Sequence, residues 1–480
     1  MKKSPIQRMV VNEMRRMYDA GNPDRMSLSW DSTPYTADQV IYHQLEMLRS
    51  RARQQARNND YVIRLIQVMQ DNIVGATGFK LRSKVKTKQG KASYKARQMV
   101  ESLWSEFEDV VSLVEFEKQI VAAQITDGEA FVFLRVGASG QLYPELIEPS
   151  RIDINYNSER GNNSIIMGIE YDDDLNPVAY HVNDTYEKQH PGVGSQIQYS
   201  GKRTRIPASN MLHVFRKLFV GQKRGVPWVA PSLGRLFQLG EAEKAALTAF
   251  RIGAAKMGFF RSEGDDEYTG DEESGDMMLN AEAGTFENIG NLHFESFDPT
   301  FPSGDFAPFV ERILKGVSSG WGVDYHTVGN DLAGVNYSSA RVGSLDTREH
   351  YKSLQTWMVK TFVKPLFKRF VTLSHFNGGF GALPHPVSAY YDAQFVGRRW
   401  DWVDPQKEAN SKKILYEIKA MSLSQIIRER GDDPEDVFNE IAEENALMLK
   451  LGITPTQVFS AIAPEEDDDE EKANAKSKAT

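Results

Sequence analysis

The sequence contains no cysteine among its 480 residues. This absence excludes disulfide bonds, thiolate metal sites and cysteine nucleophiles, and it is consistent with synthesis in a reducing compartment. Long hydrophobic runs are also lacking, because no stretch approaches the roughly 18 uncharged apolar residues of a membrane-spanning helix. Residues 1–16 are basic but lack the apolar core of a secretory signal. We therefore expect no membrane contact.

Sequence motifs of known catalytic chemistry are missing as well. There is no G-x-x-x-x-G-K-[ST] phosphate-binding loop, no H-E-x-x-H metal motif and no glycine-rich dinucleotide fingerprint. The nine histidines are scattered, and the carboxylates do not form the clustered set that a two-metal nuclease needs. The sequence therefore predicts no catalytic residue, no cofactor-binding residue and no metal ligand. It indicates a multidomain structural or interaction protein rather than an enzyme.

The length and the charge distribution point to several parts with different partners. At 480 residues the chain is too long for a single hydrophobic core, which favours two to four domains. The net charge is −9, yet residues 1–100 contain 19 Lys and Arg against 8 Asp and Glu. Because the basic and acidic residues are separated along the chain, its ends are expected to contact different partners or copies of the same chain.

The basic residues gather at the end of a predicted helix over 38–57. Its last part, RSRARQQARNND, places Arg49, Arg51, Arg53 and Arg57 close together. Two interpretations remain open: these side chains contact nucleic-acid phosphate, or they form a solvated or inter-subunit helix face. The segment KLRSKVKTKQGKASYKAR, which follows a second apolar helix over 61–73, is expected to be an exposed turn.

The next part changes from helical to strand periodicity. Two helices are predicted between Ala96 and Thr126, and short runs rich in Val, Ile, Tyr and Phe then predict an antiparallel β region from residue 127 onward. The run MLHVFR reads as a buried strand, and its His213 is expected to be a hydrogen-bonded core histidine rather than a metal ligand. The fold class is therefore α+β.

Small residues dominate a long helix predicted from Pro227 to about residue 258. Ala242, Ala246, Ala249 and Gly253 would let another helix approach closely, and we expect this helix to pack against copies of itself. Residues 261–305 then hold 13 acidic residues and one basic residue. Some of these fall at calcium-loop offsets, but the third and twelfth positions and the flanks do not fit, so an acidic projecting domain is expected instead.

A helix, a glycine-bearing loop and a second long helix are predicted between residues 305 and 373. In the loop, Gly329, Asn330 and Gly334 tolerate positive φ, so we expect a loop that projects from a rigid base. Ser338 and Ser339 are expected to cap the following helix, with Tyr337 as an anchor. Further helices are predicted from Pro405 to Leu451, and the acidic tail is expected to be disordered.

The order of several motifs resembles the portal proteins of tailed bacteriophages, in the lambda-like family. The resemblance covers roughly residues 15–460. The motifs that carry it are RARQQARNNDYVIRLIQVMQDNIVGATGFKL, ELIEPSRID, GIEYDDDLNPVAYHV, RIPASNMLHVF, GQKRGVPWVAPSL, NDLAGVNYSSAR and VDPQKEANS. VNYSSAR and GQKRGVP are the most specific of these.

The resemblance implies a dodecameric ring at one capsid vertex, through which double-stranded DNA is packaged and later ejected. It implies the terminase large subunit, the major capsid protein and a head–tail adaptor as partners. The expected places are the virion and, during assembly, the host cytoplasm. The implied division is 1–58 N-terminal arm and basic helix, 59–226 wing with the antiparallel β region, 227–260 stem helix, 261–304 acidic clip, 305–321 second stem helix, 322–340 tunnel loop, 341–404 wing helix and return segment, 405–463 crown, and 464–480 acidic tail.

Three sets of residues follow as candidate sites. The channel-loop set is Asn330, Asp331, Asn336, Tyr337, Ser338, Ser339 and Arg341; the stem-packing set is Ala242, Ala246, Ala249 and Gly253; the clip set is Asp265, Asp266, Glu272 and Glu273. Two alternatives stay open. One is a metal-dependent DNA-processing enzyme with a basic substrate-binding region, and the other is a phage head or tail structural protein without a channel.

Overall fold

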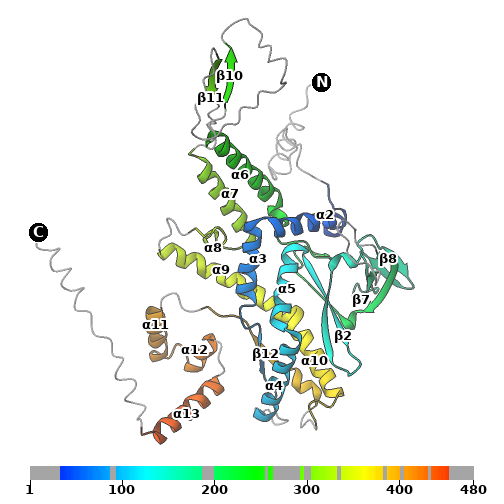
Figure 1. Cartoon of the computed structure of the whole chain (residues 1–480). Helices are drawn as coiled ribbons and strands as arrows, with labels where there is room; N and C mark the ends of the chain where they lie inside the picture. Colours follow the sequence, from blue (N-terminus) through cyan, green and yellow to red (C-terminus); the bar gives the residue numbers. More distant parts are fainter. Residues whose placement is uncertain are drawn as a thin grey trace, which may run out of the picture.

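The structure of the protein is a computed structural model. It describes residues 33–86, 93–185, 199–254, 258–262, 292–296, 304–331, 337–381, 386–400, 405–430 and 434–452. Within these ranges the fold is mixed, with many helices and several antiparallel sheets, which confirms the α+β prediction (Figure 1). None of the helices in these ranges is long and apolar enough to cross a membrane.

Four helices build the first half of the body. They are α2 (Ala37–Asn58), α3 (Asp60–Ile73), α4 (Tyr94–Val111) and α5 (Leu113–Thr126). Helix α2 begins with a capping box, in which the Thr36 hydroxyl accepts from the Gln39 amide and the Gln39 side chain accepts from the Thr36 amide. The two helices predicted between Ala96 and Thr126 are confirmed as α4 and α5.

Two antiparallel sheets follow α5. The first has the strand order β3-β2-β9, with β3 at Leu142–Ile147, β2 at Glu129–Val136 and β9 at Met211–Phe215. The second runs in chain order through β4 (Ser158–Arg160), β5 (Asn163–Ile166), β6 (Ile169–Tyr171), β7 (Pro177–Thr185) and β8 (Tyr199–Pro207). Apolar residues shared between the sheets, among them Phe131, Ile169 and Tyr180, form one core cluster. The predicted antiparallel β region is therefore confirmed.

Two helices then project from this body (Figure 1). Helix α6 (Leu233–Ala254) leads to the hairpin of β10 (Gly258–Ser262) and β11 (Leu292–Ser296), and α7 (Phe306–Trp321) returns beside it. Helix α6 begins six residues later than predicted, because Ala230–Ser232 form a 3₁₀ turn and Pro231 has no amide hydrogen to donate to a longer helix.

The chain returns to the body through one long, interrupted helix. After the short α8 (Tyr325–Gly329), α9 (Tyr337–Met358) continues through a π-helical turn, Val359–Val363, into α10 (Lys364–Phe376). Helix α9 begins at Tyr337, so Ser338 and Ser339 lie inside its first turn. Only their backbone is described, so the expectation that this serine pair caps the helix stays a prediction.

The main core lies where α4 and α10 meet. Trp104 of α4 is 1% exposed, and its ring lies 5.2–5.3 Å from those of Phe107, Phe367 and Phe370. Strand β12 (Ala393–Val396) closes this region by pairing with β1 (Lys80–Ser83). The basic segment after Gly78 therefore starts as a strand and not as a turn, because β12 supplies a hydrogen-bonding edge that lies more than 300 residues away in sequence.

Three helices end the described part of the chain. They are α11 (Pro405–Glu417), α12 (Leu423–Arg430) and α13 (Pro434–Lys450), in agreement with the helices predicted from Pro405 onward. They lie beside the body, at the lower left of Figure 1. Arg399 joins them to it by donating to the carbonyl oxygens of Arg428 and Glu429, at 3.2 and 2.6 Å.

A buried carboxylate, Glu129, joins α2, the first sheet and the segment that leads to α6. It is the first residue of β2 and is fully buried. One oxygen accepts from Arg49 of α2 and, at 2.8 Å, from Nε of Arg224. The other accepts from the Gly225 amide at 2.8 Å and lies 2.9 Å from Nε2 of His213. We refer to these five residues as the Glu129 cluster.

The cluster corrects both interpretations of the basic helix end. Arg49 is buried against Glu129, and Arg53 bonds to Asp127 at 2.6 Å and to Glu148 at 2.7 Å. The Arg49 guanidinium is therefore an internal group, and the partly exposed Arg53 is engaged by two carboxylates of its own chain. Arg51 and Arg57 remain exposed.

The GQKRGVP motif has a structural role in this cluster. Nη1 of Arg224 also donates to the carbonyl oxygens of Ile152, at 3.1 Å, and Met167, at 2.6 Å, which ties both sheets to the motif. A Cβ atom on Gly225 would lie only 2.1 Å from the carbonyl oxygen of Gly128. The backbones are therefore in direct contact, and only glycine fits at this position.

The cluster also predicts how stability depends on pH. Although burial opposes charge, the guanidinium groups of Arg224 and Arg49 hold the pKa of Glu129 well below its usual range. Burial lowers the pKa of His213 below its usual 6.5, and the nearby arginines lower it further. The predicted core histidine is therefore confirmed, with Glu129 as its hydrogen-bond partner.

We predict that the free energy of unfolding falls as the pH drops below about 6.5, because His213 then binds a proton in the unfolded chain but stays neutral in the folded chain. Below the folded-state pKa of His213 this contribution is fully lost. Urea unfolding between pH 8 and 5 should give a shallower slope for His213→Gln than for the parent chain. His43→Gln, at an exposed position, should keep the parent slope. Equal slopes for all three proteins would contradict the assignment.

Candidate channel-forming segment

The α6–α7 pair projects from the body and carries the β10–β11 hairpin at its far end (Figure 1). The two helices run side by side and are joined through the β10–β11 hairpin. The Arg235 side chain of α6 reaches across to α7, since a Cβ atom on Gly316 would lie 3.0 Å from its Nη1. The pair is held to the body by a hydrogen bond of 3.2 Å from Tyr61 of α3 to Glu243 of α6.

The predicted small-residue set lies on α6, and part of it is used within a single chain. Ala246 is buried, and Ala242 and Ala249 are half-buried. Gly253 lies in the last turn of α6. The expectation that this face packs against copies of the chain is therefore wrong for Ala246, because α6 meets its own chain there.

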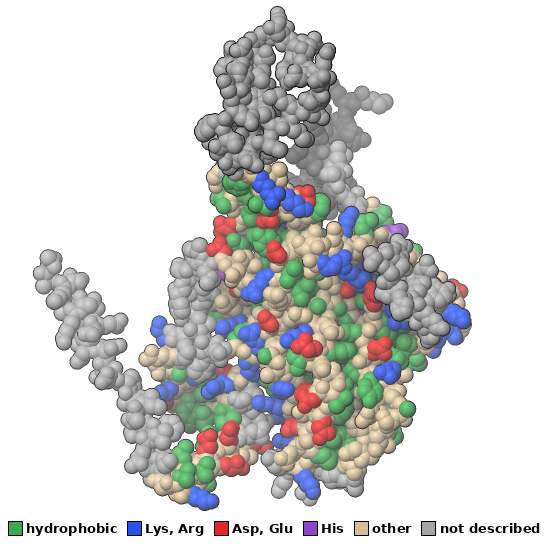
Figure 2. All heavy atoms as spheres, in the orientation of Figure 1, with side chains coloured by type: hydrophobic (Ala, Val, Ile, Leu, Met, Phe, Trp, Pro, Cys, Tyr) green, Lys and Arg blue, Asp and Glu red, His purple; other side chains and the backbone are tan. Residues whose placement is uncertain are grey.

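Large apolar side chains on this pair are exposed instead. Phe237, Leu247 and Phe250 of α6 and Phe309 of α7 are each more than half exposed. Figure 2 shows hydrophobic side chains on the surface of this projection. Aromatic and aliphatic groups gathered on a projecting element indicate a surface that another molecule covers. The apolar periodicity of α7 was visible in the sequence. It did not show which of these apolar side chains are buried against α6 and which are exposed on the surface.

The base of the predicted channel loop is built from α8. Asp331 accepts from the Tyr325 hydroxyl at 3.2 Å, and its carbonyl oxygen lies 2.8 Å from Nδ1 of His326. Arg64 of α3 donates to the carbonyl oxygen of Thr327 at 3.1 Å. Asn330 adopts a left-handed conformation, with φ of 50°, as the prediction for this loop required. Tyr325, His326 and Arg64 were not identified from the sequence.

Helix α9 closes the other side of this base. A Cβ atom on Gly343 would lie 3.1 Å from Oδ1 of Asp324, so α9 passes close to the start of α8. Tyr337, Ser338, Ser339 and Arg341 all lie in the first turns of α9, although only their backbone is described. Asn336 lies outside the described residues, as does the rest of 332–336.

The clip set also lies outside the described residues. Asp265, Asp266, Glu272 and Glu273 fall between β10 and β11, whose backbone pairing places the two ends of this acidic segment next to each other. The acidic segment therefore starts and ends at the tip of the α6–α7 pair.

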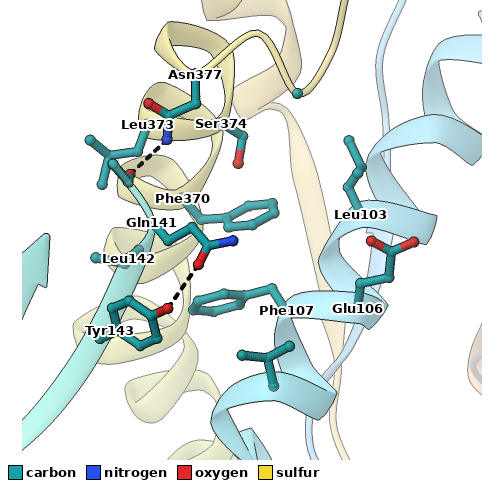
Figure 3. A pocket seen from close by; sticks show the side chains of 13 residues that line it. Leu103, Glu106, Phe107, Gln141, Leu142, Tyr143, Phe370, Leu373, Ser374 and Asn377 are labelled. Carbon is teal, nitrogen blue, oxygen red and sulfur yellow. Dashed lines mark hydrogen bonds between the residues drawn. The ribbon is translucent and has the colours of Figure 1, made fainter. Parts of the chain in front are cut away.

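A pocket of about 240 Å³ lies between α4, the β2–β3 turn and α10 (Figure 3). Leu103, Phe107, Leu142 and Phe370 make most of its lining apolar, and Asn377 donates to the Gly140 carbonyl at 2.7 Å on one side. Glu106 and Tyr143 are the titratable side chains among its lining residues. Across the described ranges, no three His, Asp or Glu side chains gather as a metal site would need.

The chain is similar to curated portal proteins over most of its length. It is 29% identical over 486 residues to the "Probable portal protein" of Halomonas phage phiHAP-1, which covers 95% of this chain and 93% of the relative. It is 22% identical over 483 residues to "Portal protein B" of Escherichia phage lambda, with 89% of this chain and 88% of the relative covered.

Among solved structures, the chain is similar to one described as "Neck of native GTA particle computed with C12 symmetry". The match covers 82% of this chain and 94% of that chain at 13% identity, with a TM-score of 0.41. Residues 23–355 match the family described as "Phage portal protein, lambda family". Since this match spans more than half of the sequence, the chain belongs to the lambda family of phage portal proteins.

Proposed function

We propose that this chain forms a closed ring, with twelve copies, at one vertex of a phage capsid, and that double-stranded DNA passes through its centre. The observation that carries this proposal is the α6–α7 pair, which projects from the body with exposed Phe237, Leu247, Phe250 and Phe309. Family membership supports the same conclusion. The ring would be a passive conduit, since portal proteins are structural components.

Burial of these side chains between neighbouring copies would stabilise the ring. Full burial of a large apolar side chain contributes about 1.5–3 kcal/mol relative to exposure. Four such groups on each copy therefore supply a substantial driving force, from which the entropy of ordering must be subtracted. A single chain leaves this surface in water, so assembly is the arrangement that the exposed pair favours.

The channel-loop residues would contact the passing DNA. Their base is held by hydrogen bonds from Tyr325 and Arg64, and the residues that follow Asp331 would be the part that meets the duplex. A rigid base lets the tip act on a moving duplex without displacing the ring. This role rests on the proposed ring, in which the loop would face the axis.

The acidic clip would serve as a docking surface. Residues 261–304 contain 12 acidic residues and one basic residue in addition to the flanking Asp305. Such a charge repels DNA phosphate and attracts basic protein surfaces. We assign it to contacts with the terminase large subunit and a head–tail adaptor, and the wing to contacts with the major capsid protein. These contacts would form first in the host cytoplasm and persist in the virion.

The two alternatives receive less support. A metal-dependent nuclease needs clustered carboxylate or histidine ligands, and none gathers within the ranges that the structure describes. A head or tail protein without a channel would not need the exposed apolar surface of the α6–α7 pair. No specific observation favours either one.

Replacement of Ala246 by Leu tests the packing of the α6–α7 pair. Ala246 is buried, so the larger side chain should overpack its surroundings and lower the free energy of unfolding by about 1–3 kcal/mol. Light scattering should also show fewer assembled rings. Ala245→Leu is the matched control, because Ala245 is exposed on the same helix and its replacement should leave the stability of the chain unchanged. Equal stability for both variants would show that α6 does not pack closely here.

Deletion of residues 332–335 tests the channel loop. The deletion spares Asp331 and its contacts with Tyr325 and His326, so folding and ring formation should be preserved. Packaging or retention of DNA should fail, because the tip that contacts the duplex is lost. The measurement is the length of DNA protected in assembled particles. Particles with full-length DNA, or chains that no longer assemble, would show that the loop does not act on DNA.

A further inference from the structure

The C-terminal helices α11, α12 and α13 expose most of their large apolar side chains. The exposed set is Ile414, Tyr416, Ile418, Leu423, Phe438, Ile441, Leu447, Leu449 and Leu451, whereas among the described residues of these helices only Ile427 and Pro434 are buried. Three helices with so small a core of their own cannot keep this surface in water at low cost. They need an external partner.

One stripe of exposed residues runs along α11. Lys407, Ser411, Ile414 and Ile418 follow one another at steps of four, three and four residues, and all four are exposed. The Ile418 amide donates to the Ile414 carbonyl at 3.0 Å, so the helical turn continues to the end of the stripe. This spacing places the four side chains on one face, with the cation at its start and the two isoleucines at its end.

A matching stripe runs along α13. Glu440, Glu444, Leu447 and Leu451 are exposed and follow the same steps of four, three and four residues. The Leu451 amide donates to the Leu447 carbonyl at 3.0 Å, which extends the face by one turn. Figure 2 shows acidic and hydrophobic side chains next to each other at the lower left, where α13 lies. Here the charges are negative and again precede the apolar pair.

The two stripes are complementary in charge and in order. Residues 405–430 contain six Lys and Arg against three Glu, whereas residues 434–452 contain five acidic residues and one lysine. In a parallel arrangement Glu440 would face Lys407, Leu447 would face Ile414 and Leu451 would face Ile418. An antiparallel arrangement would set carboxylates against isoleucines and leave them without hydrogen-bond partners.

We propose that α13 of one copy packs in parallel on α11 of the next copy. Both stripes are exposed in the same chain, and each copy of the proposed ring has two neighbours, so one neighbour would cover α11 and the other α13. Repetition of such a head-to-tail contact generates a closed ring when the rotations from each copy to the next add up to one full turn. The acidic face of α13 makes DNA an unfavourable occupant. This inference rests on the proposed ring and adds to it a second set of contacts, distant from the α6–α7 pair.

The absence of native cysteine permits a direct crosslinking test. The full-length chain carrying Ile414→Cys and Leu447→Cys is assembled and treated with a short bis-maleimide. The matched control carries Tyr416→Cys and Leu447→Cys, since Tyr416 is exposed on the opposite face of α11. The two single-cysteine variants and their equimolar mixture are treated in parallel. Light scattering on each sample reports ring assembly independently of the crosslink.

The expected result is a ladder on a denaturing gel, from dimers up to the complete ring, for Ile414→Cys with Leu447→Cys. The mixture of single variants should stop at dimers, and the control and each single variant should stay as single chains. Rings without a ladder would overturn the α11–α13 contact and leave the proposed ring in place. Dimers from Leu447→Cys alone would show that α13 pairs with α13 and would overturn it too. Chains that remain monomeric in light scattering would overturn the proposed ring together with this contact.

Discussion

The buried carboxylate of Glu129 is the interaction on which the rest of the fold depends. Its two oxygens accept from Arg49, Arg224 and the Gly225 amide, and one of them also bonds to His213. A charge in this position is costly unless it is paired and hydrogen-bonded on all sides. The need to satisfy it fixes α2, β2, β9 and the GQKRGVP segment relative to one another. The segment that leads into α6 is therefore held firmly to the body, and with it the base of the α6–α7 pair.

The molecule divides into a body with an extensive apolar core and two outlying parts with exposed apolar surface. Trp104 and its aromatic neighbours fill the body, whereas the α6–α7 pair and α11–α13 expose large apolar side chains. A rigid body with unsatisfied outlying surfaces is suited to assembly, because association buries those surfaces without rearranging the core. Membership of the portal family agrees with this division.

Periodicity in the sequence was sufficient for the helices and for the antiparallel region, because these are determined by neighbouring residues. The Glu129 cluster could not be predicted from local sequence patterns, since Arg49 and Arg224 lie 80 and 95 residues from Glu129 in the sequence. Its signal was an acidic residue at the start of a largely apolar strand and an arginine directly before Gly225. The same limit explains why Arg49 and Arg53 were interpreted as surface groups. The division into wing, stem, clip and crown came from the family resemblance and not from periodicity.

The measurement that tests this account most directly is the free energy of unfolding of Glu129→Gln, with Glu159→Gln, at an exposed position, as the control. The amide has nearly the same shape but leaves two buried guanidinium groups without a counter-charge. The account predicts a loss of about 3–5 kcal/mol for Glu129→Gln and no change for the control. Equal stability of the two variants would contradict the claim that this carboxylate holds the body and the base of the α6–α7 pair together.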